Sequence, residues 1–323
     1  MKLTNFAKFA WGVLLYNLVV ILWGAYVRAT GSGAGCGSHW PLCNGEILPR
    51  SPQLETMIEF THRLMSGLSL VLIVVLFVWA LRAYPRGHIV RKGAGLSLFF
   101  IVTEALIGAG LVLFEWVAHD ASTGRATAMT VHLANTFLLL AVIALTGWWA
   151  SGGGVPVWHN NRAPILLLVI GMLGVLILGM SGALTALGDT LFPVTSIEQG
   201  LAEDFSSTAH FLIRVRLLHP TIAIIVGIYL VIIASYLRNT RSGDGIRSFS
   251  IALTLLYILQ LGAGIINVFL LAPVWLQLVH LLLADLSWII LVLLSGATLA
   301  RKKMGSPVPE ITDREVAGHW DLP

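Results

Sequence analysis

The chain has 323 residues, of which 57% are hydrophobic and only 11% are charged. So few charges cannot cover the surface of a soluble protein of this size, so the composition predicts an integral membrane protein. The formal charge of +4 does not indicate a nucleic-acid partner, because the basic residues are distributed as membrane topology requires.

Eight apolar runs are long enough to cross about 30 Å of hydrocarbon as helices. They are expected near residues 10–29, 64–83, 93–114, 127–150, 164–187, 217–237, 248–271 and 276–299. The first run follows Lys2 and Lys8, but at roughly 18 residues it is longer than the apolar region of a signal peptide, so we interpret it as a membrane span. The predicted fold is an all-α integral membrane protein with eight transmembrane helices, arranged as two pseudo-symmetric four-helix bundles.

The positions of the basic residues predict the orientation of these spans. With the N-terminus inside, 14 of the 20 Lys and Arg residues fall on the inner side, as the positive-inside rule requires. The remaining six, which fall on the outer side, are Arg28, Arg50, Arg63, Arg125, Arg214 and Arg216. No transit-peptide composition precedes the first span, so we expect a multi-pass protein in the lipid of a bacterial cell membrane, with both termini cytoplasmic.

The two cysteines lie in the segment "CGSHWPLC", within a long predicted outer loop from Thr30 to Met57. An outer loop faces an oxidising compartment, so a disulfide between Cys36 and Cys43 is expected. A metal site is the weaker alternative, because His39 alone does not complete the ligand set. The sequence leaves open whether the disulfide only closes the loop or changes redox state during function.

An internal repeat of about 150 residues divides the chain. "GAYVRATGSG" parallels "GALTALGDTL", "THRLMSG" parallels "LHPTIAI", "IGAGLVLF" parallels "LGAGIINVF", and "VHLANTFLLL" parallels "VHLLLADLSW". The corresponding offsets are 158, 157, 154 and 148 residues. We therefore predict an N-terminal half (1–150), a C-terminal half (151–303) of the same orientation, and a cytoplasmic tail (304–323).

Four of the ten histidines lie near the start of an even-numbered span, and so at similar depth near the predicted outer face. They are His62 and His132 in the first half, and His219 and His280 in the second. Each one singly could hydrogen-bond a neighbouring helix. Four in repeat-equivalent positions, without cysteine or carboxylate partners in both halves, favour two bis-histidine haem sites.

The two halves differ in the residue that stands three positions before the first histidine. It is Glu59 in the first half and Arg216 in the second. Glu59 shares a helix face with His62 and could alternatively form an i,i+4 ion pair with Arg63. We interpret the acid as a sign that the first half is the reactive one.

Further polar residues are candidates for binding haem or for supporting its ligands. Arg214 and Arg216 are predicted contacts for haem propionates, with snorkelling at the membrane interface as the alternative. Glu104 and Asp285 lie at membrane depth and are functional candidates for that reason, but interhelical hydrogen bonding would also explain them.

Five segments together resemble the CtaA-type haem A synthase family. They are "TGSGAGCGSHWPLCNG", "IEFTHRLMSG", "VHLANTF", "RVRLLHP" and "LQLVHLLLAD", and the resemblance extends to about Ala300. The resemblance implies an oxidoreductase that converts a methyl group of haem O to the formyl group of haem A, the haem of terminal oxidases. It implies water as the oxygen source, and a haem O synthase and an electron acceptor as partners.

The resemblance also implies roles for individual residues. Haem O would lie between His62 and His132 with Glu59 as the catalytic carboxylate, and a haem b cofactor would lie between His219 and His280. The cysteine pair matches an outer-loop pair that the family links to redox coupling. Some members carry a second pair, which "GDTLFPVTSIEQGLAEDF" lacks.

Two other classes of protein remain to be distinguished from a haem-modifying enzyme. A non-catalytic di-haem electron carrier of the membrane cytochrome b type would keep two haems of one kind and form no product. A transporter is disfavoured, because carrier sites lie near the membrane midplane, whereas these histidines lie near one face.

Overall fold

The computed structural model describes residues 3–50, 52–158, 161–241 and 243–300, and within these ranges it contains helices and no strand beyond two isolated bridges. The helices are α1 (Asn5–Ala29), α2 (Leu54–Ala83), α3 (Ile89–Leu113), α4 (Thr123–Ala150), α5 (Arg162–Leu191), α6 (Ile197–Asp204), α7 (Phe211–Val215), α8 (Leu218–Thr240), α9 (Asp244–Phe269) and α10 (Val274–Leu299), with a short 3₁₀ turn η1 (Ser32–Ala34) after α1. The predicted tail, 304–323, lies outside the described residues.

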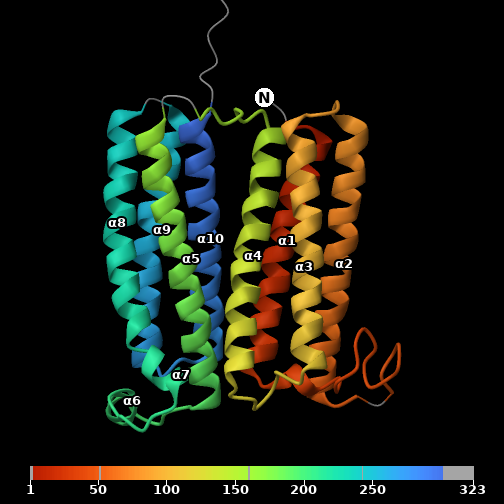
Figure 1. Cartoon of the computed structure of the whole chain (residues 1–323), viewed down its shortest axis with the longest axis vertical. Helices are drawn as coiled ribbons and strands as arrows, with labels where there is room; N and C mark the ends of the chain where they lie inside the picture. The colour runs from red at the N-terminus through yellow and green to blue at the C-terminus, as the bar shows by residue number, and fades with distance from the viewer. Residues whose placement is uncertain (1–2, 51, 159–160, 242, 301–323) are drawn as a thin grey trace, which may run out of the picture.

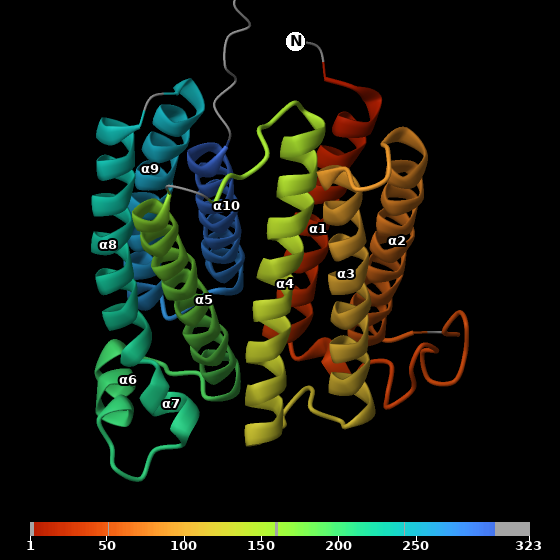
Figure 2. The same cartoon turned by 45° about the horizontal axis from the view of Figure 1, so that its top comes forward.

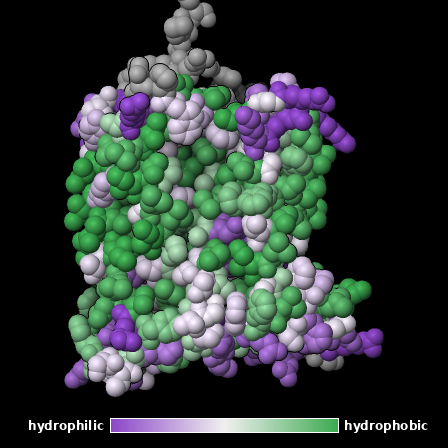
Figure 3. All heavy atoms as spheres, viewed as in Figure 1, coloured by the Kyte–Doolittle hydropathy of each residue, from purple (hydrophilic) through white to green (hydrophobic). Residues whose placement is uncertain are grey.

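The eight predicted membrane spans are confirmed, with α7 and α8 together forming the sixth, Phe211–Thr240. Figure 3 shows the corresponding apolar band between two hydrophilic ends, so this is a multi-pass membrane protein. The spans start earlier than predicted, and α2 begins at Leu54 rather than at residue 64. The apolar run locates the hydrocarbon-facing part only, whereas the backbone hydrogen bonds of α2 continue through the polar turn that contains Glu59. The connection between the fifth and sixth spans is partly helical, because α5 extends to Leu191 and α6 follows it.

The spanning helices form two sets of four (Figures 1 and 2). In each set, helices consecutive in sequence pack side by side and the first also packs against the fourth: α1 to α4 form one set, and α5, α8, α9 and α10 form the other. The two sets correspond to the predicted halves. Their relation by pseudo-symmetry stays a prediction.

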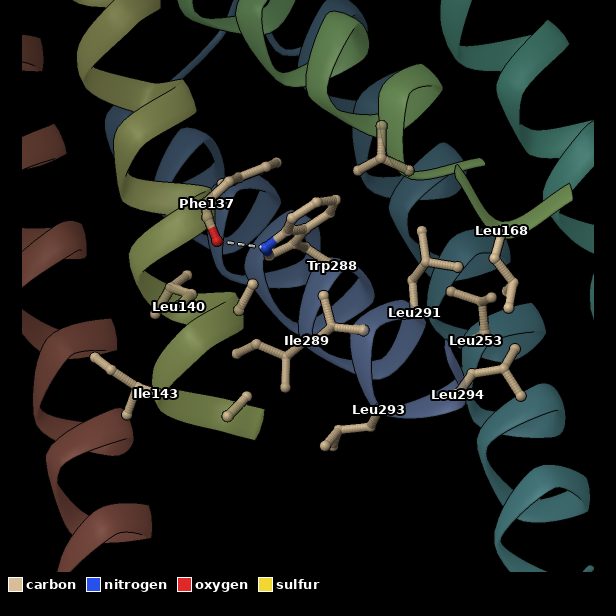
Figure 4. Close-up of a cluster of buried hydrophobic side chains, with 14 of the residues drawn as sticks. Phe137, Leu140, Ile143, Leu168, Leu253, Trp288, Ile289, Leu291, Leu293 and Leu294 are labelled. Carbon is tan, nitrogen blue, oxygen red and sulfur yellow. Dashed lines mark hydrogen bonds between the residues drawn. The ribbon is translucent and has the colours of Figure 1, made fainter. Parts of the chain in front are cut away.

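The halves meet mainly where α4 packs against α5 and α10, and α4 and α10 have the largest buried share of the eight spans. Trp288 of α10 stacks on Phe137 of α4 with ring centres 5.3 Å apart. Its indole Nε1 donates a hydrogen bond of 2.6 Å to the Phe137 carbonyl (Figure 4). An indole buried in this position needs such an acceptor, so this contact fixes α10 against α4.

The loops at one end of the bundle contain the cysteine pair, and we call this end the disulfide end. It is formed by residues 30–50, 52–53, 114–122, 192–210 and 270–273, and lies at the bottom of Figure 1. At this end Arg28 of α1 joins the halves by donating hydrogen bonds to the Ala186 carbonyl at 2.6 Å, to Thr190 Oγ1 at 2.6 Å and to Gln277 Oε1 at 2.8 Å.

Candidate functional site

The structure places the four predicted histidines near the disulfide end. Each lies six to nine residues after the first residue of its spanning helix, which is roughly 9–14 Å along the helix axis at 1.5 Å per residue. They are His62 on α2, His132 on α4, His219 on α8 and His280 on α10. The even-numbered spans therefore carry one imidazole each at similar depth, two in each half.

Each imidazole packs against a glycine of the preceding spanning helix. A Cβ atom added to Gly24 would lie 2.8 Å from His62, to Gly108 4.0 Å from His132, to Gly182 2.9 Å from His219, and to Gly264 3.1 Å from His280. The absence of a side chain at Gly24, Gly182 and Gly264 lets the ring approach the neighbouring backbone, whereas an added Cβ at Gly108 would make an ordinary contact with His132.

These glycine contacts correct one offset of the repeat. Gly108 and Gly264 are 156 residues apart, whereas the motif alignment predicts 154. The reason is that both segments contain Gly-Ala-Gly, which matches itself after a shift of two residues, so the motif alone could not specify which glycine faces the histidine.

In the second half, the imidazoles of His219 and His280 have ring centres 6.4 Å apart. Two metal–imidazole bonds of about 2.0 Å on opposite sides of one ion, plus ~1.1 Å from each nitrogen to its ring centre, would separate the centres by about 6 Å. The pair therefore fits a single axially ligated iron, as in a bis-histidine haem.

Neighbouring polar groups orient these two rings. Ser181 Oγ lies 2.9 Å from His219 Nδ1 and itself donates to the Leu178 carbonyl at 2.8 Å. The serine hydrogen is thus engaged, so Nδ1–H of His219 donates to Ser181 and leaves Nε2 free to ligate, an arrangement typical of metal-binding histidines. Gln260 Nε2 lies 3.2 Å from His280 Nε2.

In the first half, His132 lies beside an acid. Its Nδ1 is 3.6 Å from Glu104 Oε1, and among the described residues this nitrogen has no hydrogen-bond partner. His62 on α2 and His132 on α4 lie on helices of the same set, and their pairing around one haem stays a prediction.

Glu59 is buried, with 4% of its surface exposed, and its carboxylate is held by the loop and by α2 itself. Oε2 accepts a hydrogen bond of 2.8 Å from the backbone N–H of Cys36, and Oε1 accepts from Arg63 Nη2 at 2.5 Å and Nε at 3.1 Å. The i,i+4 ion pair considered from the sequence is therefore present. Arg63 also donates through Nη1 to the carbonyls of His39 and Leu42, each at 2.6 Å, a role in fixing the loop that the sequence did not indicate.

The predicted disulfide between Cys36 and Cys43 is present, and both cysteines are buried. Gly35, directly before it, packs against the α2 backbone, where an added Cβ would lie 2.5 Å from the Glu55 carbonyl carbon and oxygen. Thr56 Oγ1 donates to the Gly35 carbonyl at 2.8 Å. The disulfide loop is thus fixed on the helix that carries Glu59 and His62.

Arg216 occupies the position in the second half that corresponds to Glu59. It has the opposite charge, but it also fixes a loop. Its guanidinium lies 3.0 Å from Asp189 Oδ1 and donates to the carbonyls of Gly188 and Phe192 at 2.8 and 2.7 Å. Burial raises the pKa of the Asp204 carboxyl, whereas Arg216, 3.9 Å from it, opposes that shift. Because its donors face these protein acceptors, the propionate role of Arg216 stays a prediction, as does that of the exposed Arg214.

Asp285 is fully buried on α10. Neither of its carboxylate oxygens has a hydrogen-bond partner within the described part of the chain. Among the described residues no hydrogen bond joins Asp285 to a histidine, and its functional role stays a prediction.

Comparisons with known proteins show the family of the chain. Residues 7–292 match the COX15-CtaA family, described as cytochrome oxidase assembly protein. A protein of Thermus thermophilus named protoheme IX farnesyltransferase is 55% identical over 298 residues, covering 92% of this chain and 49% of that protein. A protein of Halalkalibacterium halodurans named heme A synthase is 36% identical over 140 residues, covering 43% of this chain and 44% of that protein. A protein of an Exiguobacterium species with the same name is 35% identical over 146 residues, covering 45% of this chain and 47% of that protein. The matches thus span about half the length of these curated relatives.

Proposed function

Because the chain belongs to the COX15-CtaA family of cytochrome oxidase assembly proteins, we propose that it is a haem A synthase, which oxidises a methyl group of haem O to a formyl group. The observation that supports this proposal is the placement of four histidines near one end of the bundle, two in each of two halves that differ in charge. The first half sets Glu59 and Glu104 near its imidazoles, whereas the second has Arg216 and Gln260 at the corresponding positions. Relatives named heme A synthase support the same reaction.

The proposed reaction requires an electron acceptor and a group that stabilises positive charge. Replacing two of the three methyl hydrogens by one oxygen from water releases four electrons and four protons, so an electron acceptor is required in addition to the chain. Positive charge develops at the methyl carbon as electrons leave it. A fixed carboxylate in a site of low dielectric stabilises such charge, typically by several kcal/mol.

The residues of each half would then have different tasks. His62 and His132 hold the substrate haem O, and His219 and His280 hold a haem b cofactor, which supplies one-electron transfer when bound. Glu59 stands one turn from His62, and its donors Cys36 and Arg63 keep its carboxylate in one position. We propose that Glu59 provides the negative charge for the reaction from this fixed position.

The Thermus relative supports a place for this reaction after a farnesyl transfer. That protein is about twice as long as the matched region and is named for farnesylation of protohaem IX. Farnesylated protohaem is haem O, the substrate proposed here. A haem O synthase is therefore the partner we propose for this chain.

The orientation in the membrane is part of the proposal. The basic residues on the connections opposite the disulfide end support a cytoplasmic location for that side, with both termini there, and the disulfide end at the outer face. Thiol labelling of single cysteines in intact cells would test this orientation.

Haem analysis tests the proposed function. The full chain is produced together with a haem O synthase in cells that form no haem A, and the extracted haems are separated into types B, O and A. Haem A is expected with the wild type, but not with His62→Ala. Intact protein in the membrane without haem A would contradict the proposal, and two retained haems of one kind would indicate the electron carrier instead.

A further inference from the structure

Glu104 on α3 and Gln260 on α9 occupy corresponding positions in the two halves. Each stands one helical turn before the glycine that contacts a histidine, Gly108 in the first half and Gly264 in the second. The two side chains approach different nitrogens of these rings: Glu104 Oε1 lies 3.6 Å from Nδ1 of His132, and Gln260 Nε2 lies 3.2 Å from Nε2 of His280. Glutamate and glutamine have the same shape, so the main chemical difference between the two side chains is the negative charge of Glu104.

The position of the Glu104 carboxylate is fixed by donors from α4. Oε2 accepts a hydrogen bond of 2.6 Å from Asn135 Nδ2, and Oε1 accepts from the Thr136 hydroxyl. Asn135 is held in turn, because its amide donates to the Phe100 carbonyl at 2.9 Å and its oxygen accepts from Thr103 Oγ1 at 2.6 Å. The Thr136 hydroxyl is shared between Oε1 and the His132 carbonyl, 2.9 Å away, whereas the Asn135 amide nitrogen can only donate, so Oε2 is an acceptor and the network favours a carboxylate beside His132.

A fixed anion beside an axial imidazole changes the iron that the imidazole ligates. A carboxylate next to the outer ring nitrogen makes the ligand more electron-donating and stabilises the more positive, oxidised iron. A neutral amide, such as that of Gln260, has no comparable effect. The haem held by His132 should therefore lose electrons more readily than the haem held by His280.

We propose that Glu104 is a positioning residue that keeps the reduction potential of the first-half haem below that of the second-half haem. This inference rests on the proposed function, in which both halves hold a haem. It gives the electrons released by methyl oxidation a favourable direction, from the first half toward the second and on to the external acceptor. The asymmetry is built into the protein and does not depend on differences between the haems themselves.

Redox titration with haem B in both halves tests this inference, because identical haems leave only the protein to separate the potentials. The full-length protein is purified, reconstituted with haem B and titrated spectroscopically. His132→Ala and His280→Ala assign each potential to its half. The key variants are Glu104→Gln, the reciprocal Gln260→Glu, and Glu104→Asp, which retains the charge.

The expected result is a lower potential in the first half of the wild type. Glu104→Gln should raise that potential by about 59 mV or more, a tenfold change in the one-electron equilibrium, while Glu104→Asp restores much of the difference. Gln260→Glu should lower the second potential. Unchanged potentials with both haems bound would overturn the inference, and if Glu104→Gln fails to bind haem in the first half, the Gln260→Glu result decides.

The outcomes also separate this inference from the proposed function. Potentials that shift as expected in a protein that forms no haem A would overturn the function alone. Haem A formation at the normal rate with unshifted potentials would overturn the inference alone. A wild-type first half that binds neither haem B nor haem O would overturn both.

Discussion

The carboxylate of Glu59 accepts a hydrogen bond of 2.8 Å from the backbone N–H of Cys36, so the disulfide loop is joined directly to the helix turn that precedes His62. Arg63 completes this connection by binding both the carboxylate and two loop carbonyls. Glu59 therefore has two separable properties, a hydrogen-bond acceptor for the loop and a negative charge near the substrate histidine.

Glu59→Gln separates these properties. The amide oxygen can still accept from Cys36, but the charge is lost, so haem binding should persist while haem A formation falls by about 10²-fold or more. Glu59→Ala should lose conversion too and in addition cost about 1–3 kcal/mol of stability, because Arg63 and the Cys36 amide lose a buried partner. Haem extraction and thermal unfolding measure the two effects. Normal conversion by Glu59→Gln would remove the charge from the mechanism.

Gly35→Ala should loosen the disulfide loop, because the added Cβ would lie 2.5 Å from backbone atoms of Glu55, which cannot move aside. Displacement of the loop would expose Cys36, so the rate at which a small phosphine reduces the disulfide should rise severalfold. Gly67→Ala on α2 is the control, since nothing lies within 4 Å of its added Cβ. Equal reduction rates in the two variants would show that the loop does not depend on this contact.

The membrane spans could be predicted from the sequence because an apolar run of this length is long enough to cross the bilayer, where a helix satisfies all of its backbone hydrogen bonds. It predicted the start of α2 poorly, since a helix continues through polar residues such as Glu59 and Arg63 once their side chains find partners. Those partners are Cys36 and the carbonyls of the disulfide loop, which are distant in sequence and carry no local pattern.

The similar depth of the four histidines could be predicted because they occupy equivalent positions in the internal repeat. The residues that contact their rings could be predicted only in part. Glu104 was noticed as a polar residue at membrane depth, but its relation to His132 depends on the packing of α3 against α4. Ser181 gave no signal, since one serine in an apolar run is ordinary.

Gly182→Ala should impair haem binding in the second half. The added Cβ would lie 2.9 Å from His219 Cε1, so the ring must move away from α5 and from its Ser181 partner. The low-spin haem absorption assigned to this half should therefore fall by half or more in protein purified at equal yield. Gly262→Ala on α9 is a matched control, because no atom lies within 4 Å of its added Cβ, and equal haem content in both variants would contradict the argument.

Trp288→Phe should weaken the contact between the halves slightly, and Trp288→Ala should weaken it strongly. Phenylalanine can keep the stacking on Phe137, but it loses the Nε1 hydrogen bond, worth about 0.5–1.5 kcal/mol, and a part of the buried indole volume. Alanine also leaves a cavity where the indole is 2% exposed, and such truncations cost about 3–5 kcal/mol. Unfolding in mixed detergent micelles measures both changes. Trp149→Phe serves as the control, because Nε1 of Trp149 has no hydrogen-bond partner in the described residues. If Trp149→Phe and Trp288→Phe lost equal stability, the hydrogen bond to the Phe137 carbonyl would contribute nothing.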